Sequence, residues 1–209
     1  MIYLYIDTSS DYLYSALSND NAILSERKVL LQQNLSKDAL YEITKMFDEA
    51  KLSPDSVDKI IVCNGPGSFT GTRIGMTIAK VYAWSKNIPV TTTNSLLAMA
   101  LSSSNNCIHI PILDARRDYV YTAIYDSNYN EILKPCHILL TELLEKIKSL
   151  ENYKFISNDE FDNLKDIESY DPDLLKIIKY TKDNDNINPH LVNPEYLKMT
   201  AAEEKKLND

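Results

Sequence analysis

The chain has 209 residues, 44% of them hydrophobic and 25% charged, which is enough to bury a core in one large or two small domains. Its formal net charge of -8 repels phosphate backbones and disfavours independent binding to nucleic acid. Cys63, Cys107 and Cys136 stand far apart in apolar contexts, which predicts buried, reduced thiols. The chain opens on a strand-like run without a signal-peptide pattern, and no apolar run is long enough to span a bilayer. We therefore expect a cytoplasmic protein.

A segment near the start of the chain returns in its second half. IDTSSDYLYSAL at residues 6–17 is matched at residues 113–124 by LDARRDYVYTAI, with Asp, Asp, Tyr, Tyr and Ala at equivalent places. Each copy predicts a strand that ends in Asp, a polar turn, and a second strand that alternates aromatic and small residues. That is the pattern of a β-hairpin.

The elements that follow each hairpin also repeat. They are a third strand at 22–30 and 131–139, a helix at 35–50 and 141–150, and a fourth strand at 59–64 and 153–158. The order β-β-β-α-β therefore occurs twice, which predicts two similar α/β lobes that face each other across a cleft. We place the lobes at residues 1–102 and 103–209, with the polar SSSNN at 102–106 as the linker.

All four glycines of the chain lie in GPGSFTGTRIG, residues 65–75, between the apolar strand KIIVC and a helical run. One interpretation is an anion cradle at a helix N-terminus, near a strand that ends in an acid. Its candidate residues are Asp7, Gly65, Gly67, Ser68, Thr70, Gly71 and Arg73. The alternative is a tight turn in which Thr70 or Thr72 caps the helix and Gly75 allows the helix to pack on the strand, with Asp7 and Asp114 capping the hairpin turns. The segment fits neither the Walker loop nor the Rossmann spacing.

The helix that follows the glycines, at about 72–86, is apolar around nearly its whole circumference. Such a helix is expected to be buried on all sides, and one side of it then needs a second protein surface. Gly75, Ala79 and Ala83 are spaced i, i+4, i+8 and would let another helix approach closely. The alternative is that the helix is sandwiched within this chain.

GPGSFTGTRIG closely resembles the signature of the bacterial TsaB (YeaZ) family. Ile6-Asp7-Thr8-Ser9, the DARR run at 114–117 and Pro194-Glu195-Tyr196-Leu197 are similar to further motifs of that family, so the resemblance spans nearly the whole chain. It implies a duplicated actin-like fold of the ribonuclease H-like class. Leu35, Tyr119 and Lys198 depart from the family pattern.

The resemblance also implies a function and partners. Members act as non-catalytic scaffolds or activators of a TsaD-like catalytic subunit, which forms threonylcarbamoyladenosine next to the anticodon of tRNAs that read codons starting with A. The complex includes a TsaE-like ATPase, and tRNA is expected to be bound mainly by the assembled complex. The chain without its partner is expected to be a homodimer. The interface with the TsaD-like subunit and the homodimer interface are both expected on the first two helices. The expected residues are Leu35, Ala39, Ile43, Gly75, Ile78, Ala79, Tyr82 and Ala83.

Catalytic chemistry is not expected from this chain alone. His109, His137 and His190 lack metal-ligand spacing, so we expect no metal and no cofactor. The second half contains no glycine, and the place equivalent to the glycine segment reads SNDE at 157–160, whose negative charge disfavours phosphate. The alternative function is a small-molecule kinase or ATPase of the actin-like fold. A capping-box pattern at 200–203 predicts a short last helix.

Overall fold

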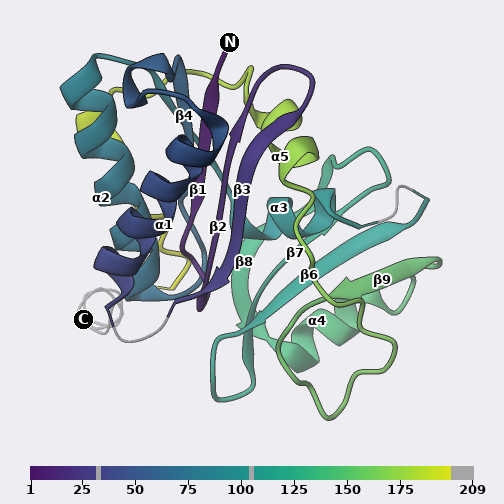
Figure 1. Ribbon diagram of the computed structural model, residues 1–209. Helices are drawn as coiled ribbons and strands as arrows, with labels where there is room; N and C mark the ends of the chain where they lie inside the picture. Colours follow the sequence, from purple (N-terminus) through teal and green to yellow (C-terminus); the bar gives the residue numbers. More distant parts are fainter. Residues whose placement is uncertain (32–33, 104–105, 199–209) are drawn as a thin grey trace.

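The computed structural model describes residues 1–31, 34–103 and 106–198, which form two mixed β-sheets with helices packed on them (Figure 1). The first sheet has the strand order β3-β2-β1-β4-β5 and the second β8-β7-β6-β9. The strands are β1 (Tyr3–Asp7), β2 (Tyr12–Ser18), β3 (Ile23–Leu30), β4 (Lys59–Cys63), β5 (Val90–Thr93), β6 (Ile108–Asp114), β7 (Tyr119–Tyr125), β8 (Glu131–Leu139) and β9 (Tyr153–Ile156). The helices are α1 (Leu35–Ala50), α2 (Phe69–Lys86), α3 (Ser95–Leu101), α4 (Leu140–Ile147) and α5 (Leu174–Thr181), with 3₁₀ turns η1 (Pro54–Ser56) and η2 (Pro189–Leu191).

The predicted duplication is confirmed, because β1-β2-β3-α1-β4 and β6-β7-β8-α4-β9 follow one topology. In each half the first two strands pair antiparallel, and the first and fourth strands pair parallel. A buried hydrogen bond is repeated as well. The Ser15 hydroxyl donates to Tyr5 O at 2.6 Å, and the Thr122 hydroxyl donates to Pro111 O at 2.9 Å. The duplicated actin-like fold predicted from the sequence is therefore present.

The first sheet is covered on both faces, with α1 and α2 on one side and α3 and α5 on the other (Figure 1). Alternate residues of β1 supply the two cores: Leu4 and Ile6 pack toward α1 and α2, whereas Tyr3 and Tyr5 pack toward α3 and α5. Burial on both faces explains the hydrophobic run at residues 3–6 of β1, which ends in the buried Asp7. No helix within the described ranges is both long and apolar enough to cross a membrane.

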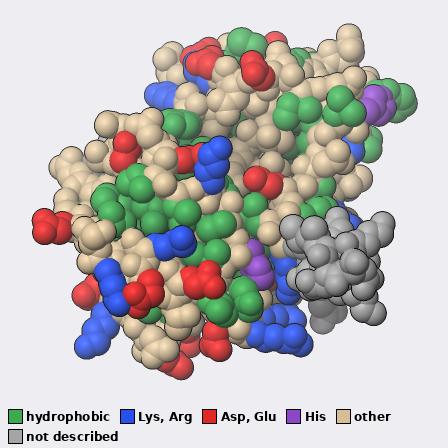
Figure 2. Space-filling view, turned by 180° about the vertical axis from the view of Figure 1, so that it is seen from behind, with side chains coloured by type: hydrophobic (Ala, Val, Ile, Leu, Met, Phe, Trp, Pro, Cys, Tyr) green, Lys and Arg blue, Asp and Glu red, His purple; other side chains and the backbone are tan. Residues whose placement is uncertain are grey.

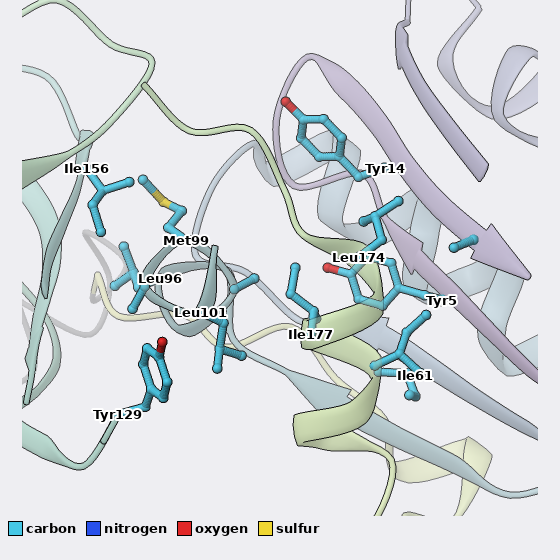
Figure 3. Packing of buried hydrophobic residues seen from close by; sticks show 14 of the residues in the cluster. Tyr5, Tyr14, Ile61, Leu96, Met99, Leu101, Tyr129, Ile156, Leu174 and Ile177 are labelled. Carbon is cyan, nitrogen blue, oxygen red and sulfur yellow. The ribbon is translucent and has the colours of Figure 1, made fainter. Parts of the chain in front are cut away.

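The core between the two sheets is built mainly around α3 and α5 (Figure 3). Leu174 and Ile177 of α5 lie beside Tyr5 and Ile61 of the first sheet, and the same cluster continues to Ile156 of the second. Sequence analysis missed α5. An Asp followed by LLKIIK was the available signal, since Asp173 accepts a hydrogen bond from Lys176 N at 3.0 Å. The division of the chain at 102/103 stays a prediction, and α5 packs across it.

Beyond α5 the chain returns to the first lobe, and we call residues 182–198 the C-terminal strap. Its backbone joins the edge of the sheet where Ile187 N donates to Val90 O at 2.7 Å. Val192 is buried in the core beneath α2, and Glu195 N donates to Asn64 O at 2.9 Å beside the glycine segment. The predicted helix at 200–203 lies outside the described residues.

Candidate functional site

The glycine segment is a site of close backbone packing. A Cβ added at Gly67 would overlap Ser9 O, and one added at Gly71 would overlap Thr8 O. A Cβ at Gly75 would overlap the Thr8 hydroxyl. Three of the four glycines therefore press the start of α2 against the end of β1, and any side chain would separate the two elements.

Hydrogen bonds fasten this contact. The Thr8 hydroxyl donates to Gly71 O at 2.7 Å and accepts from Gly75 N at 3.0 Å, so it inserts between two groups that are one helical turn apart. Ser68 N donates to Ser9 O at 2.6 Å. Backbone groups that an anion cradle needs are thus used inside the protein.

The helix cap differs from the predicted one. α2 begins at Phe69, and its N-cap is Ser68, whose hydroxyl accepts from Gly71 N at 3.2 Å. The expectation that Thr70 or Thr72 caps the helix was wrong, because the chain already turns into the helix before them. Thr72 is buried at 5% exposure.

A cleft of ≈ 540 Å³ lies between the two halves at the glycine segment. Gly67, Ser68 and Thr70 line it from the first half. The remaining anion-site candidates do not: Asp7 and Gly71 are buried, Gly65 lines a neighbouring pocket under the C-terminal strap, and Arg73 faces a groove on the other side of α2. The structure thus brings three of the seven predicted residues to the cleft and places the other four elsewhere, and anion binding there stays a prediction.

Asp7 and Asp114 both cap hairpin turns, as the structural interpretation of the sequence predicted. Asp7 Oδ1 accepts from Ser9 N at 2.8 Å, and Asp114 Oδ1 accepts from Arg116 N at 2.8 Å. Asp7 also receives the Tyr5 hydroxyl at 3.3 Å and is 3% exposed, and its burial raises the pKa of the carboxyl group. A carboxyl group in this position has no open side for a metal ion or a substrate.

A phosphate site needs hydrogen-bond donors, but the second half of the chain contributes the carboxylates of Asp114 and Asp159 to the lining of the cleft. Arg116 of the second half and Asp11 of the first half line the cleft beside them. Asp159 Oδ2 accepts from Asp114 N at 2.7 Å, so the SNDE turn occupies a backbone donor. In the part of the chain that the structure describes, no group of three or more His, Cys, Asp or Glu side chains is arranged to hold a metal ion.

A second concave surface lies between α1 and α2, on the outside of the first lobe. We call this ≈ 840 Å³ depression the α1–α2 groove. Its apolar lining is Leu40, Ile43, Phe47 and Leu52 from α1 and its C-terminal turn, and Phe69, Ile74, Ile78, Val81 and Tyr82 from α2. Leu40 is 50% exposed and Val81 59% exposed. Trp84, one turn beyond Val81, is 65% exposed.

The structure divides the predicted interface residues into two groups. Ile43, Ile78 and Tyr82 line the groove, and their role at an interface stays a prediction. Gly75, Ala79 and Ala83 on α2 and Ala39 on α1 are buried in the core of the first lobe, so they are not exposed to a partner. Leu35 is only partly buried, and its role at an interface stays a prediction.

The reason is the distance between α2 and the sheet. Small residues face inward because α2 lies close to β1, and this turns Val81 and Trp84 outward. The alternative, that this helix is sandwiched within the chain, was therefore wrong for the described residues, and the covering of its exposed side by a second protein surface stays a prediction. Val81, Trp84 and Phe69 were not among the predicted interface residues, because a helix that is apolar all round has no periodicity to show which side faces solvent.

Comparison with known proteins agrees with this fold. The sequence model of the family described as TsaD, tRNA N6-adenosine threonylcarbamoyltransferase, matches residues 29–174. The tRNA threonylcarbamoyladenosine biosynthesis protein TsaB of Bacillus subtilis is 29% identical over 223 residues, which cover 98% of this chain and 97% of that protein. The chain belongs to the TsaB (YeaZ) branch of the TsaD family.

Two further relatives of this TsaB-family chain cover most of its length. An uncharacterised protein of Mycoplasma genitalium is 30% identical over 185 residues, 85% of this chain and 84% of its own. The solved structure of YeaZ from Pseudomonas aeruginosa superposes with a TM-score of 0.74 at 18% identity, and the match covers 93% of this chain and 100% of that one. At that identity the second match shows the shared fold.

Proposed function

We propose that this TsaB-family chain is a non-catalytic subunit in the synthesis of threonylcarbamoyladenosine beside the anticodon of tRNAs that read codons starting with A. It binds a TsaD-like catalytic subunit through the α1–α2 groove and stabilises that subunit in its active form. The observation that carries the proposal is the groove itself. Two helices expose apolar side chains there, and Val81 and Leu40 are 59% and 50% exposed. Such a surface is typical of a protein interface.

The interlobe cleft supports a non-catalytic role. The aspartate at the end of β1 is buried and hydrogen-bonded, and the turn that follows β9 presents Asp159 in place of phosphate-binding donors. Phosphoryl transfer depends on positioned cations and donors around the transferred group. Three carboxylates and one cation, Arg116, line the cleft, and this excess of negative charge would repel a nucleotide phosphate.

The further partners follow from the same proposal. A TsaE-like ATPase joins the complex, tRNA is held mainly by the assembled complex in the cytoplasm, and the free chain forms a homodimer through the same groove. Figure 2 shows acidic and basic side chains interspersed on one face of the molecule, so this face offers no continuous basic track for an RNA backbone.

Co-expression with the cognate TsaD-like subunit tests the proposal. We expect the two chains to co-elute, and the modified adenosine to form only when both are present. Val81→Asp places a charge in the groove and is expected to abolish co-elution, whereas Ile132→Asp, at a similarly exposed position on β8, is expected to retain it. Undiminished modification without this chain, together with no co-elution, would falsify the proposal.

The second candidate function is an actin-like small-molecule kinase or ATPase. The observation that favours it is the cleft of ≈ 540 Å³, which residues of both halves line. Calorimetry of the isolated chain with Mg-ATP separates the two functions. Tight binding with turnover would support the enzyme, and the absence of heat would support the scaffold.

A further inference from the structure

One edge of the first sheet is a strand with an unpaired outer side. β3 is the terminal strand of that sheet (Figure 1), and no other strand of the described ranges pairs with its outer side. The second sheet ends in the equivalent strand β8, which contains Pro135, whereas β3 contains no proline. Proline on an edge strand lacks a backbone donor and hinders the addition of a further strand. The edge of the first sheet is therefore open to another strand, and the edge of the second is interrupted.

Alternate residues of β3 present their backbone groups to this open edge. The register between β2 and β3 is regular over residues 25–30, and beyond it Leu31 N donates to Asp11 O at 2.8 Å. Hydrogen bonding alternates from residue to residue in an antiparallel pair, so the odd-numbered residues of this stretch bond to β2. Glu26 and Lys28 consequently direct their N–H and C=O groups away from the sheet.

Arg27 lies beside this edge and is neutralised by α1. Its Nε donates to Glu42 at 2.8 Å, and its Nη2 donates to Glu49 at 2.7 Å. Its Nη1 donates to Glu26 O at 2.8 Å. A carbonyl oxygen has two lone pairs, so Glu26 O keeps one position for an incoming N–H group. Because two carboxylates surround the guanidinium, a second copy of Arg27 can approach it.

The exposed side chains of β3 are complementary to themselves. They are Leu24, Glu26, Lys28 and Leu30. If a second copy of β3 lies antiparallel with Arg27 opposite Arg27, each Glu26 faces the Lys28 of the other copy, and the leucines at the two ends come together. Residues that lie opposite each other in this way have Cβ atoms about 4.5–5.5 Å apart. A shift of two residues in either direction would place Glu26 opposite Glu26 or Lys28 opposite Lys28.

We propose that β3 is a two-fold interface at which two copies of this chain pair antiparallel and join their first sheets. The residues that carry the complementary charges, Glu26 and Lys28, are also those whose backbone groups face outward, so each pair exchanges both backbone hydrogen bonds. The occupant is a second copy because the pattern matches its own reverse. This inference goes beyond the proposed function, since no residue of β3 lines the α1–α2 groove.

The existing contacts of the two charged residues are compatible with this pairing. Glu26 forms no ion pair with the residues that the structure describes. Lys28 pairs with the exposed Asp171 at 2.7 Å, and an ammonium group has three donors, so it can hold both acids. One added strand pair is smaller than the about 1,200 Å² of a stable interface, and we expect a dimer that depends on concentration.

The test is sedimentation equilibrium of the Val81→Asp variant, in which self-association through the α1–α2 groove is blocked. We expect this variant to show a monomer–dimer equilibrium. Glu26→Lys or Lys28→Glu, added to it, is expected to weaken dimerisation at least about tenfold, because each places like charges opposite each other. Circular dichroism checks that every variant is folded. In the parent chain, amide exchange at Glu26 and Lys28 is expected to slow as the concentration rises.

A mixture of the two single variants tests the register. Glu26→Lys leaves two cations on this face of the strand and Lys28→Glu leaves two anions, so the two variants are expected to associate with each other at least as tightly as the parent associates with itself. The double variant Glu26→Lys/Lys28→Glu exchanges the two charges. It is expected to dimerise within about threefold of the parent, because the opposite charges again face each other.

Two control variants separate this pairing from a general effect of charge. Lys134→Glu makes the same charge reversal at an exposed position of β8, the edge that contains Pro135. Asp171→Asn breaks the ion pair of Lys28 within the chain and keeps the cation. Both are expected to dimerise within about twofold of the parent in the Val81→Asp background.

Three results would each overturn the inference: a Val81→Asp variant that stays monomeric, single variants at Glu26 and Lys28 that dimerise like the parent, or a mixture that does not associate. Co-elution with the catalytic subunit is measured separately, and Lys28→Glu with Val81 intact is expected to retain it. Loss of co-elution there would assign β3 to that subunit and overturn the inference. If the parent does not co-elute while Val81→Asp dimerises through β3, the proposed function fails and the inference stands.

Discussion

The two halves of the chain share a strand order but make the turn after their fourth strand in different ways. In the first half, glycines let α2 lie against the backbone of Thr8 and Ser9. In the second half, the SNDE turn reaches the equivalent strand end through a side chain, since Asp159 accepts from Asp114 N at 2.7 Å. The first contact has no room for a side chain at the glycines, whereas the second is made by the Asp159 side chain.

This difference explains where each half carries its surface features. A helix packed by glycine and alanine against the sheet directs its large apolar residues outward, and the α1–α2 groove results. No α-helix directly follows β9 within the described chain, where an irregular segment leads to α5. The two halves thus share a strand order but differ in the turn after the fourth strand. That turn decides that the first half, and not the second, presents an apolar face.

Gly71→Ala should have the largest effect on this comparison. The new Cβ would overlap Thr8 O, a backbone atom, so either α2 or β1 must move, at a cost of about 3 kcal/mol of the free energy of unfolding. Urea denaturation followed by circular dichroism measures it. Thr77→Ala on the exposed side of the same helix serves as the control and should stay within about 0.5 kcal/mol of the parent. Equal stability of both variants would refute the close approach.

Thr8→Val should come next. It keeps the shape of the side chain and removes the hydroxyl that serves both Gly71 O and Gly75 N, and it should cost about 2 kcal/mol because buried backbone groups lose a partner. Thr122→Val, in the second half, removes the main hydroxyl bond to Pro111 O and should cost about 1 kcal/mol. A larger loss of the free energy of unfolding for Thr122→Val than for Thr8→Val would contradict the prediction that the hydroxyl contact of the first half is the more stabilising one.

The hydroxyl caps of the two turns should differ little. Ser68 accepts from Gly71 N at 3.2 Å and Ser157 accepts from Asp159 N at 3.0 Å. Ser68→Ala and Ser157→Ala should each lower the free energy of unfolding by about 1 kcal/mol. Thermal unfolding of both variants checks whether the glycines alone make the turn of the first half differ in stability from that of the second. A much larger loss of stability for Ser68→Ala would show that the Ser68 cap contributes to this difference too.

The last prediction concerns how stability depends on pH. Burial raises the pKa of Asp7 above its usual 3.8, so the folded protein holds this proton more tightly than the unfolded chain. Stability from this group is then fully present below the unfolded pKa and falls as pH rises through the folded pKa. Asp7→Asn should flatten that fall, because the amide side chain carries no titrating proton. Parallel profiles for the parent and Asp7→Asn would contradict the assignment.

The strands and most helices were predictable because their signals are local. The repeated hairpins, α1 and α4 appear in the sequence as alternation or helical periodicity, and the spans agree with the structure within a few residues at either end. Cys63, Cys107 and Cys136 are free thiols, and Cys63 and Cys107 are buried as predicted, whereas Cys136 is only partly buried. α5 escaped because its eight residues give a short pattern, although its cap at Asp173 was readable.

The candidate site was less predictable. Its location on the first two helices follows from the family motifs, whereas the residues that face solvent depend on how closely α2 approaches β1. Gly75, Ala79 and Ala83 look like a surface for a partner helix when α2 is considered alone, and they are the residues that pack on the protein's own sheet. Arg73 looked like an anion ligand for the cleft, and the strap residue Tyr196 holds it at the groove.

The sequence by itself determined the duplication, the strand-helix order and the family, because each is recorded in periodicity or in a motif of adjacent residues. Only the tertiary structure decided what GPGSFTGTRIG does. Glycine is required both where a backbone must approach a phosphate and where it must approach another backbone, and the sequence is the same in the two cases. Here the atoms that Gly67 and Gly71 approach are the carbonyl oxygens of Ser9 and Thr8, which the chain brings there from more than fifty positions earlier.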